Sequence, residues 1–81
     1  MQREEIKEIV NDFLIDEFEI EPEQINDNTS LRDELEIESL DLVDIIVMIE
    51  KKFGMKVKPE EIIKVQTMHE LYDFIEARVN N

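Results

Sequence analysis

Apolar residues near the start of the chain recur every three or four positions. The residues that follow this spacing are Ile6, Ile9, Val10, Phe13, Leu14 and Phe18. Positions i, i+3, i+4 and i+7 share one face of an α-helix, so the pattern predicts an amphipathic helix here. Acidic side chains fill the intervening positions and fall on the opposite face, which we expect to contact solvent.

The widest apolar pattern runs from about Ser39 to Phe53. Two neighbouring stripes form it, one made of Leu42, Ile46, Ile49 and Phe53 and the other of Leu40, Val43 and Val47. An apolar arc this wide predicts a helix that touches more than one other element. Ser39 suits the N-cap of such a helix, and Gly54 suits the position just after its last residue. Lys51 and Lys52 suit the negative end of its dipole.

Two further helices follow. Residues 67–70, Thr-Met-His-Glu, fit a capping box that precedes apolar residues at helical spacing. Residues 59–65 begin with Pro59 and predict a short helix that depends on tertiary packing. Residues 19–38 form a long connection rich in turn-forming side chains. We expect its apolar residues to hold it against the core, and these are Ile20, Ile25, Leu31, Leu35 and Ile37.

These elements predict an all-α fold. The chain of 81 residues has one Gly and two Pro, too few turn-formers for a sheet with tight hairpins. We therefore expect a single domain over residues 1–81, built as a bundle of three main helices and one short helix. A long loop joins the first and second helices.

Charge is distributed unevenly along the chain. The net charge is −13, from 22 acidic and nine basic residues. Residues 1–50 contain 17 acids and three bases, whereas residues 51–81 contain five acids and six bases. Such a surface disfavours nucleic acid and anionic lipid as partners. It fits either a solubilising surface or a docking face for basic partners, and charge alone does not separate the two.

The sequence offers little for catalysis or metal binding. Its single histidine, His69, falls in the proposed capping box, and no G-x-S-x-G motif surrounds any serine. Residues 27–33 superficially resemble a calcium loop. However, Arg32 stands where an EF-hand requires glycine, which excludes that interpretation. The chain lacks cysteine and has neither a signal-peptide pattern nor an apolar run near the ~18 residues of a membrane span. We expect a cytoplasmic, monomeric protein that is not an enzyme.

The segment Leu35-Glu36-Ile37-Glu38-Ser39-Leu40-Asp41 resembles a motif of the acyl carrier protein family. In that family a modified serine, between an acidic residue and leucine, begins the second helix. The length, the acidity, the order of the helices and the Phe53-Gly54 end of the motif helix are also similar. The Val57-x-Pro59-Glu60-Glu61 approach to the short helix is similar as well, so the resemblance covers essentially the whole chain.

The resemblance implies specific roles for residues of this chain. Ser39 would carry a covalent 4′-phosphopantetheine that a separate phosphopantetheinyl transferase takes from coenzyme A. Acyl intermediates would be held on it as thioesters and presented to fatty-acid or polyketide-type enzymes. The acids expected to meet basic docking patches on these enzymes are Glu38, Asp41, Asp44 and Glu50. The residues expected to line an acyl cavity, with ordinary core packing as the alternative, are Leu42, Ile46, Ile62 and Leu71.

Three other functions are compatible with the sequence, and the sequence also departs from the family pattern at several positions. A peptidyl carrier and a D-alanyl carrier share the fold and prosthetic group, and an unmodified acidic helical adaptor would also suit the charge. The family usually has Gly where Glu36 stands, Asp where Glu38 stands, and acids where Lys51 and Lys52 stand. These departures predict a specialised carrier with its own enzymes.

Overall fold

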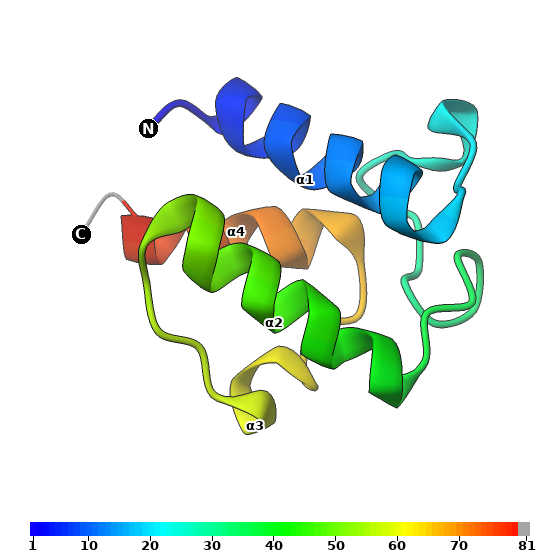
Figure 1. The fold of residues 1–81 in the computed structure, drawn as a ribbon. Coiled ribbons are helices and arrows are strands. Elements are labelled where there is room, and N and C mark those ends of the chain that lie inside the picture. Colours follow the sequence, from blue (N-terminus) through cyan, green and yellow to red (C-terminus); the bar gives the residue numbers. More distant parts are fainter. Residues whose placement is uncertain (80–81) are drawn as a thin grey trace.

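The computed structural model describes residues 1–79, and over that range the predicted all-α architecture is confirmed. Helix α1 spans Arg3–Phe18, α2 spans Ser39–Phe53, α3 spans Pro59–Ile62 and α4 spans Met68–Val79. A 3₁₀ turn, η1, covers Pro22–Gln24 within the long loop between α1 and α2. Helices α1 and α4 pack together, and α3 lies against α2 (Figure 1).

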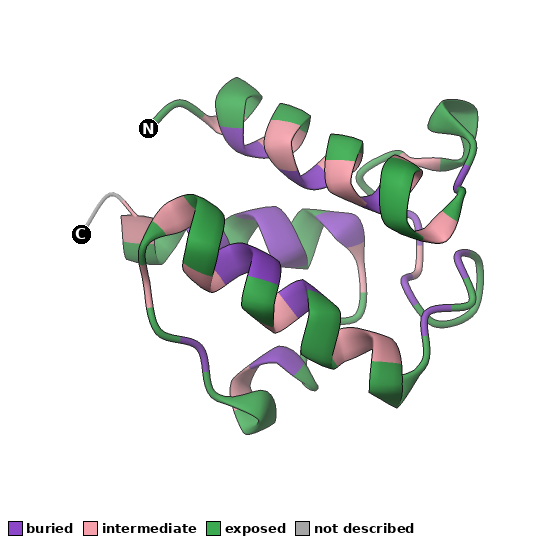
Figure 2. Cartoon of the chain, viewed as in Figure 1, coloured by how far each residue is buried: buried purple, intermediate pink, exposed green. Residues whose placement is uncertain are grey.

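One apolar core joins all of these elements. The inward-facing positions of the four helices are buried (Figure 2). Those that are no more than 1% exposed are Ile6, Val10, Leu14, Ile45, Ile49, Ile62, Met68, Leu71, Tyr72 and Ile75. Of the five apolar loop residues expected to contact the core, Ile20, Leu31, Leu35 and Ile37 are buried in it, and Ile25 is half-buried against it. The expectation that the loop is held by its apolar side chains is therefore confirmed.

The ends of the helices agree in part with those predicted from the sequence. Gly54 follows α2 with φ +65°, and its N–H donates to the Glu50 carbonyl at 3.0 Å, as expected for a glycine at this position. The Thr67–Glu70 capping box is present, because each residue's backbone N–H donates to the other's side chain, at 3.0 and 3.2 Å. The short helix α3 ends at Ile62, three residues before the predicted end.

The prediction that Ser39 is the N-cap of α2 is wrong. The helix begins at Ser39 itself, and Glu38 is the residue with extended backbone before it. The Asp41 carboxylate, in the first turn of the helix, accepts the Glu38 N–H at 3.0 Å, which is the arrangement of a capping box. The Ser39 side chain therefore does not cap the helix and is exposed to solvent.

Glu36, which stands where the family usually has glycine, has φ +55°. This is the left-handed region, which costs an L-residue about 1–2 kcal/mol. Glu36 therefore adopts the glycine-type conformation without being glycine. Its neighbours Leu35 and Ile37 are both buried, and their burial holds the segment before Ser39 in this conformation.

The long loop is tied to the start of α4 by backbone hydrogen bonds. The N–H groups of Met68 and His69 donate to the carbonyls of Thr29 and Asp27, at 3.0 and 2.9 Å, and the Leu31 N–H donates to the Gln66 carbonyl at 2.9 Å. Satisfying the first N–H groups of a helix in this way stabilises both partners. The loop thus has a defined path from α1 to the start of α2.

Thr29 is the one buried polar side chain among the described residues. Its hydroxyl donates to the Gln24 carbonyl at 2.9 Å and accepts the Asn26 N–H at 3.0 Å. Thr29→Val keeps the shape but leaves both groups unpaired, so we expect a loss of about 1–3 kcal/mol in the free energy of unfolding. Urea titration followed by circular dichroism measures it. Thr29→Ser, which retains the hydroxyl, serves as the control, and parental stability of Thr29→Val would contradict this assignment.

Candidate functional site

Ser39 lies at the exposed first position of α2, at the end of the loop. Its side chain makes no hydrogen bond within residues 1–79, so the hydroxyl oxygen is accessible to a reagent. No basic side chain forms a hydrogen bond with it in the same region, so Ser39 has no hydrogen-bonded base that could activate it as a nucleophile. Modification at this residue requires an outside catalyst.

The backbone around Ser39 suits an attached phosphate. Within the described part of the chain, the N–H groups of Ser39 and Leu40 donate to no acceptor, whereas the Asp41 N–H donates to the Glu38 carbonyl. Free N–H groups at the positive end of a 15-residue helix favour an anion. The Glu38 and Asp41 carboxylates oppose this effect in part. An open groove of about 550 Å³ adjoins the serine, lined by Arg32, Glu36, Ile37, Glu38, Ser39 and Leu40.

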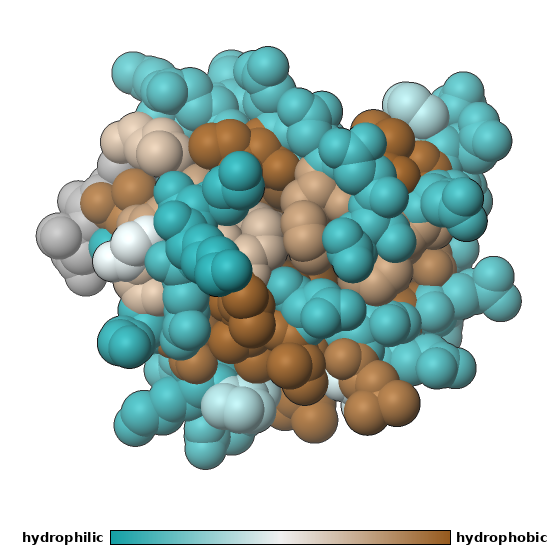
Figure 3. Space-filling view, in the orientation of Figure 1, coloured by the Kyte–Doolittle hydropathy of each residue, from teal (hydrophilic) through white to brown (hydrophobic). Residues whose placement is uncertain are grey.

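An apolar stripe on α2 begins beside Ser39 and faces solvent. Its members Leu40, Val43 and Val47 are 82%, 58% and 42% exposed. Figure 3 shows apolar surface gathered over α2 on this face of the molecule. The sequence predicted a wide apolar arc on this helix, but only its inner part, including Ile45 and Ile49, is buried. We call the three exposed residues the α2 stripe.

The four predicted docking acids lie on α2 or just before it, in different environments. Glu38 and Asp44 are exposed, whereas Asp41 and Glu50 are half-buried. The Asp41 carboxylate accepts the Glu38 N–H, and the Glu50 carboxylate accepts the Val57 N–H at 3.1 Å. Glu50 therefore holds the turn after α2, and its charge is less available to a partner than that of Asp44.

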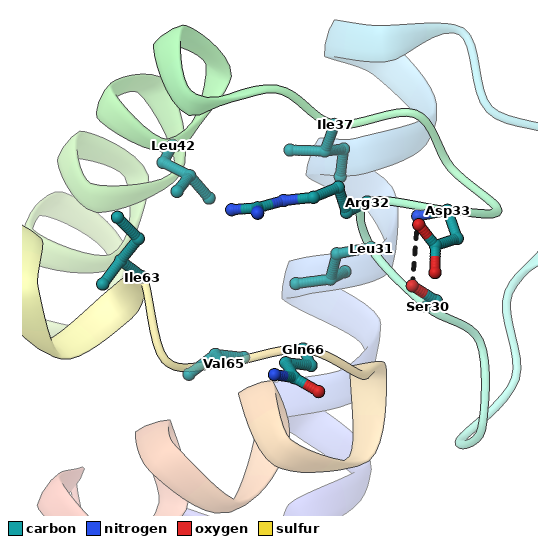
Figure 4. A pocket seen from close by; sticks show the side chains of 9 residues that line it. All are labelled: Ser30, Leu31, Arg32, Asp33, Ile37, Leu42, Ile63, Val65 and Gln66. Carbon is teal, nitrogen blue, oxygen red and sulfur yellow. Dashed lines mark hydrogen bonds between the residues drawn. The ribbon is translucent and has the colours of Figure 1, made fainter.

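A cavity of about 240 Å³ lies between the long loop, α2 and the segment after α3 (Figure 4). Its lining residues are Ser30, Leu31, Arg32, Asp33, Ile37, Leu42, Ile63, Val65 and Gln66. Of the four acyl-cavity candidates from the sequence, Leu42 lines this cavity. Ile62 and Leu71 are buried in the core, and Ile46 is half-buried against it.

Arg32, Ile63 and Val65 were not among the candidate site residues from sequence. Their place in the cavity wall depends on how the loop and the α3 segment fold against each other, which helical periodicity does not report. One signal for Arg32 was present, since it is the only base between Lys7 and Lys51. Helical spacing could not indicate that its guanidinium enters a cavity.

Comparison with known proteins finds a matching family and relatives over nearly the whole chain. The family model described as a phosphopantetheine attachment site matches residues 5–75. An acyl carrier protein of Rubrobacter xylanophilus is 35% identical over 75 residues, covering 93% of each chain. One of Lactobacillus acidophilus is 31% identical over 77 residues, covering 95% of this chain and 96% of its own. One of Thermosynechococcus vestitus is 33% identical over 79 residues, covering 98% of both.

The chain belongs to the acyl carrier protein family. Acyl carrier proteins are carriers and not catalysts, which confirms the prediction that this chain is not an enzyme. The group that this family attaches is 4′-phosphopantetheine, which supplies a thiol for thioester chemistry. The carrier itself has to present that group and be recognised. In residues 1–79 no helix is long and apolar enough to cross a membrane.

Proposed function

We propose that this carrier holds acyl intermediates as thioesters on a 4′-phosphopantetheine attached to Ser39. The observation that carries the proposal is the exposed, unpartnered hydroxyl of Ser39 at the start of α2, beside two free backbone N–H groups. Attachment forms a phosphodiester between Ser39 Oγ and the 4′-phosphopantetheine phosphorus of coenzyme A. Adenosine 3′,5′-bisphosphate leaves, and the transferase takes up the serine proton.

Intact mass spectrometry tests this proposal. The purified apo chain is incubated with coenzyme A, Mg²⁺ and a broad-specificity phosphopantetheinyl transferase, and a known carrier serves as the positive control for the transferase. We expect the mass to rise by one phosphopantetheinyl group. No gain by the folded chain, while the known carrier is modified, would contradict the proposal and favour the unmodified adaptor.

We further propose that partner enzymes dock on α2 next to Ser39. Contiguous exposed apolar residues mark interaction surfaces, and the α2 stripe provides them beside the attachment point. The acids around it, Glu38, Asp41 and Asp44, complement a basic patch, with Glu50 contributing less because of its hydrogen bond to Val57. The partners are the transferase and the enzymes that load, extend or remove the acyl group in fatty-acid or polyketide-type synthesis, in the cytoplasm.

Charge reversal on α2 tests the docking surface. We expect Asp44→Lys to lower kcat/KM of the transferase on the order of tenfold at low salt, because a rim charge mainly controls the association rate. Added salt should shrink the difference. Asp12→Lys on the exposed side of α1 changes net charge equally and is the matched control. Equal losses in the two variants would mean that only net charge matters and would contradict docking at Asp44.

A further inference from the structure

The cavity beside α2 is lined by five apolar residues, by the polar residues Ser30 and Gln66, and by the charged residues Arg32 and Asp33. Leu31, Ile37, Leu42, Ile63 and Val65 supply apolar side chains from three separate segments. Figure 4 shows the Arg32 side chain extending across the cavity from the loop, so that its guanidinium lies between Ile37 and Leu42. A cationic group therefore faces the apolar side chains of the cavity, and Arg32 is the one base among its lining residues.

Arg32 has no acidic partner. Its guanidinium forms no ion pair or hydrogen bond within residues 1–79, although the surrounding half of the chain is strongly acidic. The adjacent Asp33 extends to the opposite side of the loop, where its backbone N–H donates to Ser30 Oγ at 3.1 Å (Figure 4). The only base between Lys7 and Lys51 thus lines the cavity while it remains exposed to solvent, and its donors are free of protein partners in the described chain.

Arg32 also connects the cavity to the attachment point. The same residue lines the open groove that contains Ser39, and Ile37 borders both spaces. A group tethered to Ser39 that turns back along this groove reaches the guanidinium as it enters the cavity. The Arg32 guanidinium therefore lies between the attachment residue Ser39 and the apolar residues of the cavity.

The chemistry of guanidinium selects the kind of cargo. It stays charged in proteins and presents N–H donors in a fork that matches a carboxylate in a bidentate pair. A purely alkyl chain placed against it would leave those donors unpaired and displace their water, which costs free energy. The volume of about 240 Å³ lies below the ~300–1,000 Å³ of clefts that hold drug-sized ligands, which favours a short group.

We propose that this cavity receives a short acyl group that ends in a carboxylate, with Arg32 binding the carboxylate and the apolar wall contacting the methylene groups. This inference rests on the proposed function, because the acyl group must be tethered at Ser39. It distinguishes this carrier from one whose cargo is a plain alkyl chain. The phosphodiester on Ser39 would be a second anion of the tethered group that could pair with Arg32, and the experiment separates the two.

Two six-carbon cargoes that differ only at their far end provide the test. The transferase loads the apo chain from hexanoyl-coenzyme A or adipoyl-coenzyme A, and intact mass confirms each product. Melting temperatures are then compared with that of the chain bearing unacylated phosphopantetheine. We expect the adipoyl form to melt about 4 °C or more above the hexanoyl form.

Variants of Arg32 test whether the guanidinium causes the difference in melting temperature. Arg32→Leu should abolish the adipoyl advantage and Arg32→Gln should reduce it. Both should fold, because the Arg32 side chain is exposed and forms no hydrogen bond or ion pair in the described chain. Lys64→Leu removes an exposed charge next to the cavity wall and should keep the advantage. In the parent, the Nε–H resonance of Arg32 should shift with adipoyl and remain unchanged with hexanoyl.

Three outcomes would overturn the inference. One is a hexanoyl form as stable as the adipoyl form, and another is an adipoyl advantage that survives Arg32→Leu. The third is an Arg32→Leu effect already complete in the unacylated phosphopantetheinyl form, which would assign the guanidinium to the phosphodiester. Failure to load either cargo, seen as no mass gain, would instead refute the proposed function.

Discussion

Ser39→Ala should gain no phosphopantetheinyl group under conditions in which the parent is modified completely. The variant lacks the only atom that can form the phosphodiester at the start of α2. We expect the fold to be unaffected, because the Ser39 side chain is exposed and forms no hydrogen bond in the described chain. Substitutions of this kind change the free energy of unfolding by about 0.5 kcal/mol or less. Intact mass and a melting curve on the same sample measure both effects.

The chain has one other serine, and it provides the control. Ser30 is half-buried, and its hydroxyl accepts the Asp33 N–H at 3.1 Å inside the loop. Ser30→Ala should therefore be modified fully, although it loses some stability with that hydrogen bond. Modification of Ser39→Ala, or loss of modification in a folded Ser30→Ala, would show that Ser39 is not the attachment residue.

Leu71→Ala should destabilise the carrier severely. The side chain is fully buried in α4, and truncating a buried leucine to alanine costs about 2–5 kcal/mol. A core this small supplies only about 3–5 kcal/mol in total. We expect the melting temperature to fall by at least about 10 °C, because 1 kcal/mol shifts it by about 4–8 °C in a domain of this size. Urea titration gives the free energy directly.

This variant also separates the two roles that the sequence left open for Leu71. A residue bordering a cargo cavity is partly unpacked and loses less on truncation, whereas a core residue loses the full amount. Leu40→Ala is the reference, since Leu40 is 82% exposed and its truncation should change stability by about 0.5 kcal/mol or less. If Leu71→Ala were as stable as Leu40→Ala, the assignment of Leu71 to the core would be wrong.

The sequence alone determined much of the architecture. Apolar periodicity located the three long helices, because burial of one helical face requires apolar residues every three or four positions. Gly54 and the Thr67–Glu70 pair marked helix ends, because these positions need particular backbone angles and hydrogen-bond partners. The family motif singled out Ser39, since it depends on neighbours in sequence and not on distant contacts.

Tertiary structure decided the features that depend on packing between segments. It placed Leu40 and Val43 in solvent while burying Ile45 on the same helix, because only one side of α2 faces the shared apolar core. By contrast, Glu38 and not Ser39 precedes the helix because of a local hydrogen bond, in which the Asp41 carboxylate accepts the Glu38 N–H.

The cavity is the clearest case of a feature that sequence could not specify. Its walls come from the loop, from α2 and from the residues after α3, and each segment's own pattern accounts only for its local conformation. In the sequence Arg32 is an isolated base in an acidic stretch, and the fold directs its side chain into the cavity beside Leu42. Helical and turn patterns are set by neighbouring residues, whereas a cavity exists only once distant segments have packed.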